Sequence, residues 1–185
     1  MARNRTRKSL VRRGPRREPY DRVLIVCEGE KTEPNYLAEL ISQWQLSSAN
    51  VQVKGDGGSD PGSVVGYAIE LFEASPDYDR VYCVFDRDQH ATFAEAVERV
   101  RQKTLVRREG KRRLGNAHFE AIVSTPCFEY WIFSHYEYST TPLARYADIR
   151  PLLLRIQDLV DYEKGKRGLF SLTQSRLEAA LNNAD

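Results

Sequence analysis

The sequence feature that most constrains the fold is an apolar run that stops at an acid. Residues 23–27 are mostly β-branched or Leu, which predicts a strand buried on both faces of a sheet. Glu28 and Gly29 follow, and a glycine at this place would let a ligand or metal approach the backbone. A helical pattern begins near Glu33 with Pro34 in its first turn. We therefore expect a carboxylate at the carboxyl end of a buried parallel strand, where open α/β sheets place their sites.

A second stretch repeats the pattern. Residues 81–85 are again apolar and are followed by Asp86 and, two positions later, Asp88. Two carboxylates at such a spacing can both turn toward one ion, and Mg²⁺ or Mn²⁺ prefers oxygen ligands. Glu28, Asp86 and Asp88 are therefore the predicted metal ligands and catalytic acids. The alternative is that these acids lie in solvated turns and have no chemical role.

The same acids give the chain a resemblance to a known domain. Glu28-Gly29 after one strand and Asp86-x-Asp88 after a later one resemble the Toprim domain, the Mg²⁺-binding α/β module of topoisomerases, bacterial primases and overcoming-lysogenization-defect nucleases. Over residues 20–170 the chain is similar, more narrowly, to the RloB-like family of bacterial and archaeal proteins. The segments that carry this similarity are VCEGEKTEPNY, YCVFDRDQH, STPCFEYWIFSHY and YEKG.

The resemblance implies a Toprim-like sheet with the two acidic strands adjacent, and a nuclease that acts with an ATPase in restriction or phage defence. It also implies roles for residues outside the strands. Glu129 would lie near the acids as a further ligand, or else serve as a structural acid that caps a helix. Glu33 is the nearest match to a second glutamate of the overcoming-lysogenization-defect nucleases, at a slightly different spacing. Lys164 would reach a phosphate in the site.

Basic side chains gather in two places. Residues 1–17 hold eight of the 28 Lys and Arg residues and no acid, so the rest of the chain is net acidic. Such an arm typically stays disordered and binds phosphate backbones, unless it only aids solubility. A second cluster, in a predicted loop with Gly110 and Gly115, either tracks a nucleic-acid backbone or is merely solvated. The predicted substrate-binding residues are Lys31, Arg107, Arg108, Lys111, Arg112, Arg113 and Lys164.

Two further features allow a chemical and a plain interpretation. Residues 55–62 form a glycine-rich stretch before a predicted helix, so they could cradle a phosphate or form an ordinary surface loop. The stretch is not a P-loop, because the Gly-Lys-Ser/Thr ending is absent. His90 lies beside the acids and could contact a metal, a phosphate or a proton in transfer, or simply begin a helix.

Composition excludes several classes of protein. The cysteines Cys27, Cys83 and Cys127 are isolated, which argues against zinc ribbons and disulfide frameworks. No apolar run approaches the ~20 residues that span a bilayer, and the N-terminus lacks the apolar segment of a secretory signal. We expect a cytoplasmic protein that does not enter a membrane.

Together these patterns predict an α/β protein with a mostly parallel, doubly wound, Toprim-like sheet, helices on both faces and a helical C-terminal part. Residues 1–19 would be a basic arm and residues 20–185 one domain. The predicted function is metal-dependent hydrolysis of phosphodiester bonds in DNA or RNA, with Mg²⁺ or Mn²⁺ and a partner ATPase. The alternatives are a non-catalytic nucleic-acid-binding or regulatory subunit of an ATPase complex, and a nucleotidyl transferase.

Overall fold

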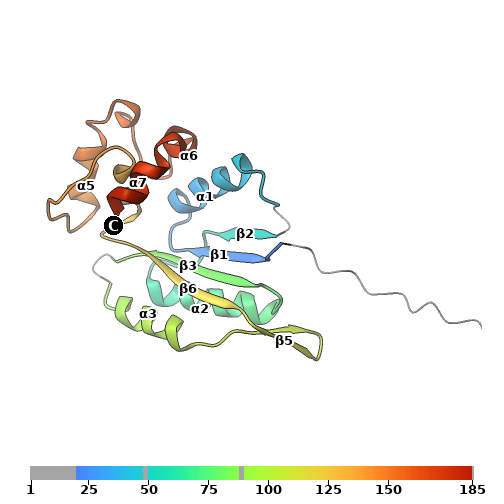
Figure 1. The fold of residues 1–185 in the computed structure, drawn as a ribbon. Helices are drawn as coiled ribbons and strands as arrows, with labels where there is room; N and C mark the ends of the chain where they lie inside the picture. Colours follow the sequence, from blue (N-terminus) through green and yellow to red (C-terminus); the bar gives the residue numbers. More distant parts are fainter. Residues whose placement is uncertain (1–19, 48–49, 88–89, 185) are drawn as a thin grey trace, which may run out of the picture.

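The computed structural model describes residues 20–47, 50–87 and 90–184, so the basic N-terminal arm lies outside the described residues. Strands and helices alternate from β1 to α3, three successive strands follow, and short helices come after them (Figure 1). The strands are β1 (Val23–Cys27), β2 (Val51–Lys54), β3 (Arg80–Asp86), β4 (Val106–Glu109), β5 (Arg112–Asn116) and β6 (His118–Ser124). The helices are α1 (Thr32–Gln43), α2 (Pro61–Ala74), α3 (Phe93–Gln102), α4 (Phe128–Ser134), α5 (Tyr146–Leu153), α6 (Leu169–Thr173) and α7 (Leu177–Ala184).

The main sheet is parallel and has the strand order β2-β1-β3-β6. The apolar run of β1 forms an inner strand, as predicted. Cys27 pairs with Val84, and Asp86 pairs with Ser124. The acid that follows β1 and the acid that ends β3 therefore lie at the same edge of the sheet. The predictions that the sheet is parallel and that the two acidic strands are adjacent are confirmed.

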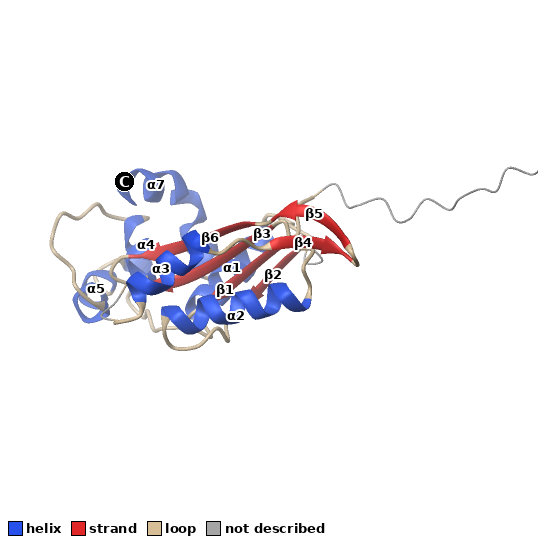
Figure 2. Cartoon of the chain, turned by 90° about the horizontal axis from the view of Figure 1, so that it is seen from below, coloured by secondary structure: helices blue, strands red, loops and turns tan. Residues whose placement is uncertain are grey.

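Helices cover both faces of this sheet, as predicted. α2 and α3 lie on one face and α1 on the other (Figures 1 and 2). Alternate strand residues such as Leu24, Val26 and Phe85 point toward α2 and α3, where they form a buried apolar core with Ala96 and Val100 of α3. The strands are thereby fixed in register, since a slip by one residue would turn this apolar set toward the opposite face.

The C-terminal part is helical, as predicted, and forms a second buried core with α1. Tyr36 of α1 packs edge-on against Phe128 of α4 and Phe170 of α6, with ring centroids 5.4 Å apart in both pairs. Leu153 and Leu169 are fully buried in the same cluster. This core attaches the C-terminal helices to the start of α1 and so to the acidic edge of the sheet.

The apolar spacing from about residue 147 onward predicts one amphipathic helix that ends near the YEKG segment, and this prediction is wrong. α5 ends at Leu153, and only a single 3₁₀ turn, Gln157–Leu159, follows before the chain reaches Tyr162. Pro151 lies inside α5, where it lacks the N–H that a longer helix would use. Ile156, with ψ of 125°, is extended. The apolar spacing therefore marks buried residues correctly without marking one continuous helix.

The basic stretch after α3 forms an antiparallel hairpin of β4 and β5, so the prediction of a loop is wrong. Its turn contains Gly110, which has a φ of +58°, a value that glycine adopts readily. The hairpin lies beyond the amino ends of β3 and β6, because Arg108 N–H donates to the Pro76 carbonyl and β6 begins immediately after β5. Within the described residues, no helix is long and apolar enough to cross a membrane.

Candidate active site

Glu28 and Asp86 come together where β1 and β3 end. The backbone N–H of Asp86 donates to Glu28 Oε2 at 3.1 Å, so the first acid is held against the start of the second acidic segment. The other oxygen of Glu28 lies 3.2 Å from His90 Nε2. The Glu28 side chain is only 15% exposed. The convergence of these two acids at the carboxyl edge of the sheet is therefore observed, and His90 joins them.

Glu33 also lies at this edge, in the first turn of α1, and is buried. The reason is visible at Gly29, where an added Cβ would lie 2.5 Å from Glu33 Oε2. This glycine was predicted to allow the approach of a ligand. The structure shows that its missing side chain makes room for the Glu33 carboxylate, which lies against the backbone after β1.

Glu129 reaches the site from α4 and is almost fully buried. Its Oε1 accepts a hydrogen bond of 3.0 Å from the Tyr162 hydroxyl and lies 3.8 Å from Lys164 Nζ. The Lys164 ammonium also sits 4.4 Å from the centre of the Tyr146 ring. Neither tyrosine was predicted to belong to the site, although Tyr162 is part of the YEKG segment that carries the family resemblance.

The segment that carries Lys164 is anchored to the start of α1. Gly165 N–H donates to Thr32 Oγ1, and the Asn35 side-chain amide donates to the Gly165 carbonyl, each at 3.0 Å. Gly165 has a φ of +83°, and a Cβ there would lie 2.9 Å from the Cβ of Lys31. Both the positive φ and the close approach of Lys31 require glycine at position 165. This approach brings Lys31 and Lys164 together at the acidic edge.

These side chains surround one cavity of about 400 Å³. Its lining contains five carboxylates, two lysines and one histidine, from four separate parts of the chain. The residues are Glu28, Gly29, Glu30, Lys31, Thr32, Glu33, Asp86, His90, Glu129 and Lys164. The cavity thus unites all of the predicted acids except Asp88, which lies outside the described residues.

The concentration of negative charge changes how the acids ionise. Burial, followed by the charges of Glu33, Glu129 and Glu28, raises the pKa of Asp86 to about 8. Burial is also the main cause that raises the pKa of Glu33. For Lys164, burial lowers the pKa, but the surrounding carboxylates, Glu129 foremost, outweigh it and raise the pKa overall. The site therefore favours an added proton or an added cation.

The donor set suits a hard divalent cation, because every acidic ligand is a carboxylate and none of the lining residues is a cysteine. The charge of the site also favours a cation, because a bound cation would stabilise the ionised form of Asp86 against the burial and the carboxylate repulsion that raise its pKa. Within the described part of the chain, however, no group of three or more His, Cys, Asp or Glu side chains is already arranged to hold a metal ion. The residues fit such an ion in chemistry and charge, and a full ligand set would also draw on rearranged side chains or on Asp88.

The predicted substrate-binding residues separate into two groups. Lys31 and Lys164 line the acidic cavity. Arg107, Arg108, Lys111, Arg112 and Arg113 belong to the hairpin beyond the amino end of the sheet, so the structure does not bring them to the acids. The prediction for Arg107 is corrected, because its side chain is only 12% exposed and its guanidinium pairs with Asp79 at 2.7 Å. That residue anchors the root of the hairpin, and a direct role in binding substrate no longer follows from its charge.

The glycine-rich stretch before α2 folds as a capped helix entrance. Asp60 accepts hydrogen bonds from the N–H groups of Gly62 and Ser63 at 2.9 and 3.2 Å. The Asp60 carboxylate thus occupies the position that a phosphate would take at this N-terminus. Of the two interpretations of residues 55–62, the plain surface loop fits the structure better.

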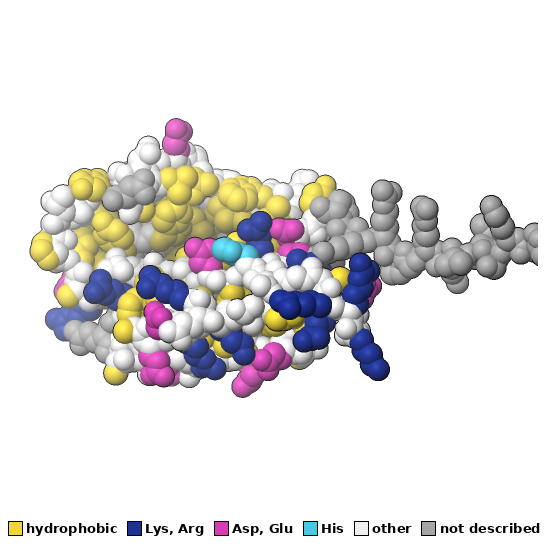
Figure 3. All heavy atoms as spheres, turned by 60° about the horizontal axis from the view of Figure 1, so that its bottom comes forward, with side chains coloured by type: hydrophobic (Ala, Val, Ile, Leu, Met, Phe, Trp, Pro, Cys, Tyr) yellow, Lys and Arg dark blue, Asp and Glu magenta, His cyan; other side chains and the backbone are white. Residues whose placement is uncertain are grey.

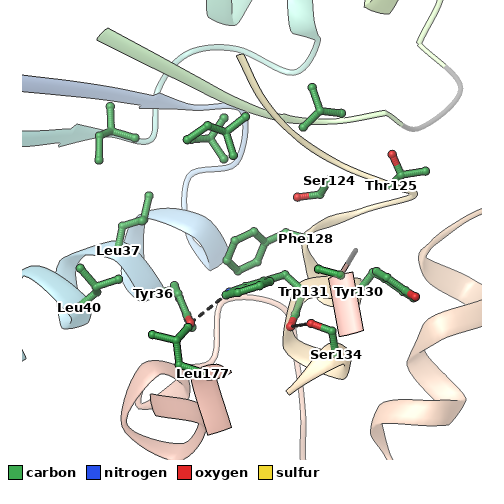
Figure 4. Close-up of a pocket in the computed structure, with 15 residues that line it drawn as sticks. Tyr36, Leu37, Leu40, Ser124, Thr125, Phe128, Tyr130, Trp131, Ser134 and Leu177 are labelled. Carbon is green, nitrogen blue, oxygen red and sulfur yellow. Dashed lines mark hydrogen bonds between the residues drawn. The ribbon is translucent and has the colours of Figure 1, made fainter. Parts of the chain in front are cut away.

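A second cavity, of about 500 Å³, lies on the α1 side of the sheet next to the acidic one. It is mainly apolar, and Phe128, Tyr36 and Trp131 line it together (Figure 4). Trp131 Nε1 donates to the Tyr36 hydroxyl at 3.1 Å, which joins α4 to α1. Both cavities draw on the same two helices, because Glu33 and Tyr36 belong to α1 and Phe128 and Glu129 belong to α4.

The fold and the cavity define an α/β protein with a carboxylate cluster at the carboxyl edge of a parallel sheet. A family model described as RloB-like protein matches residues 23–185, and the chain belongs to the RloB-like family. No curated protein and no solved structure matches the chain.

Proposed function

We propose that this protein is a metal-dependent nuclease with a Toprim-like site, which hydrolyses phosphodiester bonds of DNA or RNA. The observation that carries the proposal is the shared cavity of Glu28, Glu33, Asp86 and Glu129 at the carboxyl edge of the sheet. One or two Mg²⁺ or Mn²⁺ ions bound there would polarise a phosphate oxygen and activate water. Glu28 and Asp86 are the first ligands proposed, with Asp88 as the third.

The chain's own groups supply the remaining requirements of such a reaction. Lys31 and Lys164 place two positive charges on the cavity wall, where they can hold the phosphate of the substrate. His90, at 3.2 Å from Glu28, can accept or donate a proton at its Nε2. Tyr162 fixes the Glu129 carboxylate by donating to its Oε1, so that Glu129 stays directed into the cavity.

The direct test is cleavage of plasmid DNA and of transfer RNA by the purified protein with Mn²⁺ or Mg²⁺. We expect Asp86→Asn and Asp88→Asn to lower the cleavage rate by about 100-fold or more, because a neutral amide is a poor ligand for a hard cation. Glu95→Gln is the matched control, since Glu95 is an exposed acid on α3. Circular dichroism should show the same fold for all variants. Full cleavage by both aspartate variants would overturn the proposal.

One observation favours a second candidate, a non-catalytic nucleic-acid-binding or regulatory subunit. Lys164 already supplies a positive charge beside Glu129, and the described residues hold no group of three donors arranged for an ion. Calorimetric titration with Mn²⁺ separates the two candidates. Binding that Asp86→Asn abolishes supports the nuclease, whereas no binding together with retained affinity for nucleic acid supports the subunit.

The family resemblance adds a partner and a setting to this proposal. We propose that the protein acts in the cytoplasm with an ATPase encoded beside it, in defence against phage. Co-expression of the two proteins, followed by co-purification and a cleavage assay with and without ATP, tests this part separately. Cleavage that is unchanged by the ATPase, with no co-purification, would remove the partner from the proposal and leave the nuclease intact.

A further inference from the structure

The β4–β5 hairpin is a separate structural unit, and it is anchored to the described part of the chain at its root. It forms its own two-stranded sheet and does not extend the main one. At the root, Arg107 pairs with Asp79 at 2.7 Å, and Ala117 N–H donates to the Leu105 carbonyl at 2.8 Å. Arg108 N–H also donates to the Pro76 carbonyl at 2.7 Å. These contacts fix the direction in which the hairpin leaves the domain.

The outer part of the hairpin projects into solvent. A Cβ added at Gly110 or at Gly115 would meet no atom within 4 Å. Four basic side chains on this part are exposed, and Glu109 is the acid among them; the basic residues are Arg108, Lys111, Arg112 and Arg113. The face drawn in Figure 3 shows Lys and Arg side chains gathered toward this end of the molecule. The projection is therefore a basic finger.

The charges of this finger are poorly compensated by the protein itself. Arg108 and Arg113 face each other across the two strands, and like charges directly opposite destabilise a strand pair. Glu109, which faces Arg112, is a single acid among the four basic residues. Within residues 20–47, 50–87 and 90–184, none of the four basic side chains forms an ion pair. Arg113 donates to the side chain of Asn116, which is neutral. A polyanion bound along the finger would supply the missing counter-charge.

We propose that the basic finger, residues 108–113, binds the phosphate backbone of nucleic acid at a place remote from the acidic cavity. The finger lies at the amino end of the sheet and the cavity at its carboxyl end. The seven residues of β3 separate the two sites by roughly 20 Å at about 3.3 Å per residue. The inference has a second part, which rests on the proposed nuclease function. The substrate is a nucleic acid longer than about six nucleotides, at 3.4 Å each, and it is held at both places.

Binding without a divalent cation tests the finger itself. The probes are a fluorescein-labelled DNA duplex of about 30 base pairs and a labelled transfer RNA, and anisotropy is followed in EDTA at several KCl concentrations, with the full chain. The test variant carries Lys111→Ala, Arg112→Ala and Arg113→Ala. The matched control carries Arg150→Ala and Arg155→Ala, which remove exposed charges from the C-terminal part.

We expect the Kd of the triple variant to rise at least about tenfold near 0.1 M salt for one or both probes. The slope of log K against log salt should fall by two to three, since about 0.9 counterion is released for each phosphate neutralised. The control should keep the wild-type Kd and slope. Unchanged affinity and slope in the triple variant for both probes would overturn the proposal, as would an equal loss in the control.

Cleavage then tests the substrate class and keeps the two proposals apart. With Mn²⁺, the triple variant should show a raised KM and an unchanged kcat on the long probes, and wild-type rates on a tetranucleotide. Equal KM values on the long probes would contradict simultaneous contact at both sites. Asp86→Asn should bind in EDTA with the wild-type salt slope. If no cleavage is found but binding depends on the finger, the nuclease proposal fails and the finger remains.

Discussion

The two ends of the parallel sheet carry opposite charges and hold them differently. At the carboxyl end, Glu28, Glu33 and Glu129 are largely buried, and burial, followed by the charges of these acids, raises the pKa of Asp86 to about 8. At the amino end, the exposed side chains of Lys111 and Arg112 contact mainly solvent. The acidic end therefore depends on neighbouring atoms for its geometry, whereas the basic end depends on the direction of its hairpin.

This difference predicts that a single methyl group is enough to disable the acidic end. Gly29→Ala would place a Cβ 2.5 Å from Glu33 Oε2, so the carboxylate must move away from the position it holds. We expect Mn²⁺ affinity and any Mn²⁺-dependent cleavage to fall by about 100-fold, since displacements near 1 Å have effects of that size. Stability should change little, because the displaced atom is the end of a flexible side chain.

Gly66→Ala is the control for this substitution. Gly66 lies in α2, and its added Cβ would have Arg99 Nη1 as its nearest neighbour, at 3.8 Å. The exchange should leave Mn²⁺ affinity unchanged and keep or slightly raise stability, because alanine favours a helix over glycine. Wild-type affinity in Gly29→Ala would show that the position of Glu33 does not matter to the site.

Within the basic end, the root and the tip of the hairpin are expected to contribute differently to stability. Arg107→Ala breaks the pair with Asp79, whose side chains are 12% and 10% exposed, and should lower the free energy of unfolding by about 2 kcal/mol. Arg113→Ala removes an exposed charge and should change it by less than about 0.5 kcal/mol. Urea denaturation of both variants measures the difference. Equal free energies would mean that Arg107 does not anchor the hairpin.

The carboxyl end of the sheet was predicted better from the sequence than the basic hairpin at the amino end. The acidic strand ends were found because a buried strand and the acid that follows it are local patterns, and parallel strands bring such ends together. The hairpin was expected to be a loop because a run of charged residues has no apolar alternation that would indicate strands. Its distance from the acids depends on the path of the chain after α3, which no local pattern contains.

The contacts of the acids were also beyond sequence reasoning. Tyr162 is 33 residues from Glu129, and their hydrogen bond depends on how the C-terminal helices pack on α1. The role of Gly29 was assigned to ligand approach, because the sequence cannot show that Glu33 turns back toward it from α1. A motif can therefore identify the members of a site while leaving their mutual positions undetermined.

The smallest expected effect comes from pH, and it tests whether burial among the other acids raises the pKa of Asp86. The usual pKa of an aspartate is 3.8, and that of Asp86 is raised to about 8, chiefly by burial. Between these values the folded state keeps a proton that the unfolded chain has lost. Stability of the metal-free protein should therefore be full below about pH 4 with respect to this group and decline as the pH rises toward 8.

Asp86→Asn removes this dependence, because the amide is neutral at every pH. At pH 8.5, in EDTA, the variant should melt about 3 °C or more above the wild type, whereas near pH 5 the two should differ much less. Glu95→Gln, on the exposed face of α3, should follow the wild type at both pH values. Mn²⁺ should then raise the wild-type melting temperature at pH 8.5 and leave that of Asp86→Asn nearly unchanged, because only the wild type offers the cation a charged carboxylate there. Parallel pH profiles for the wild type and Asp86→Asn would mean that folding does not raise the pKa of Asp86, and the acids of the carboxyl end would then behave like the solvent-exposed charges of the basic end.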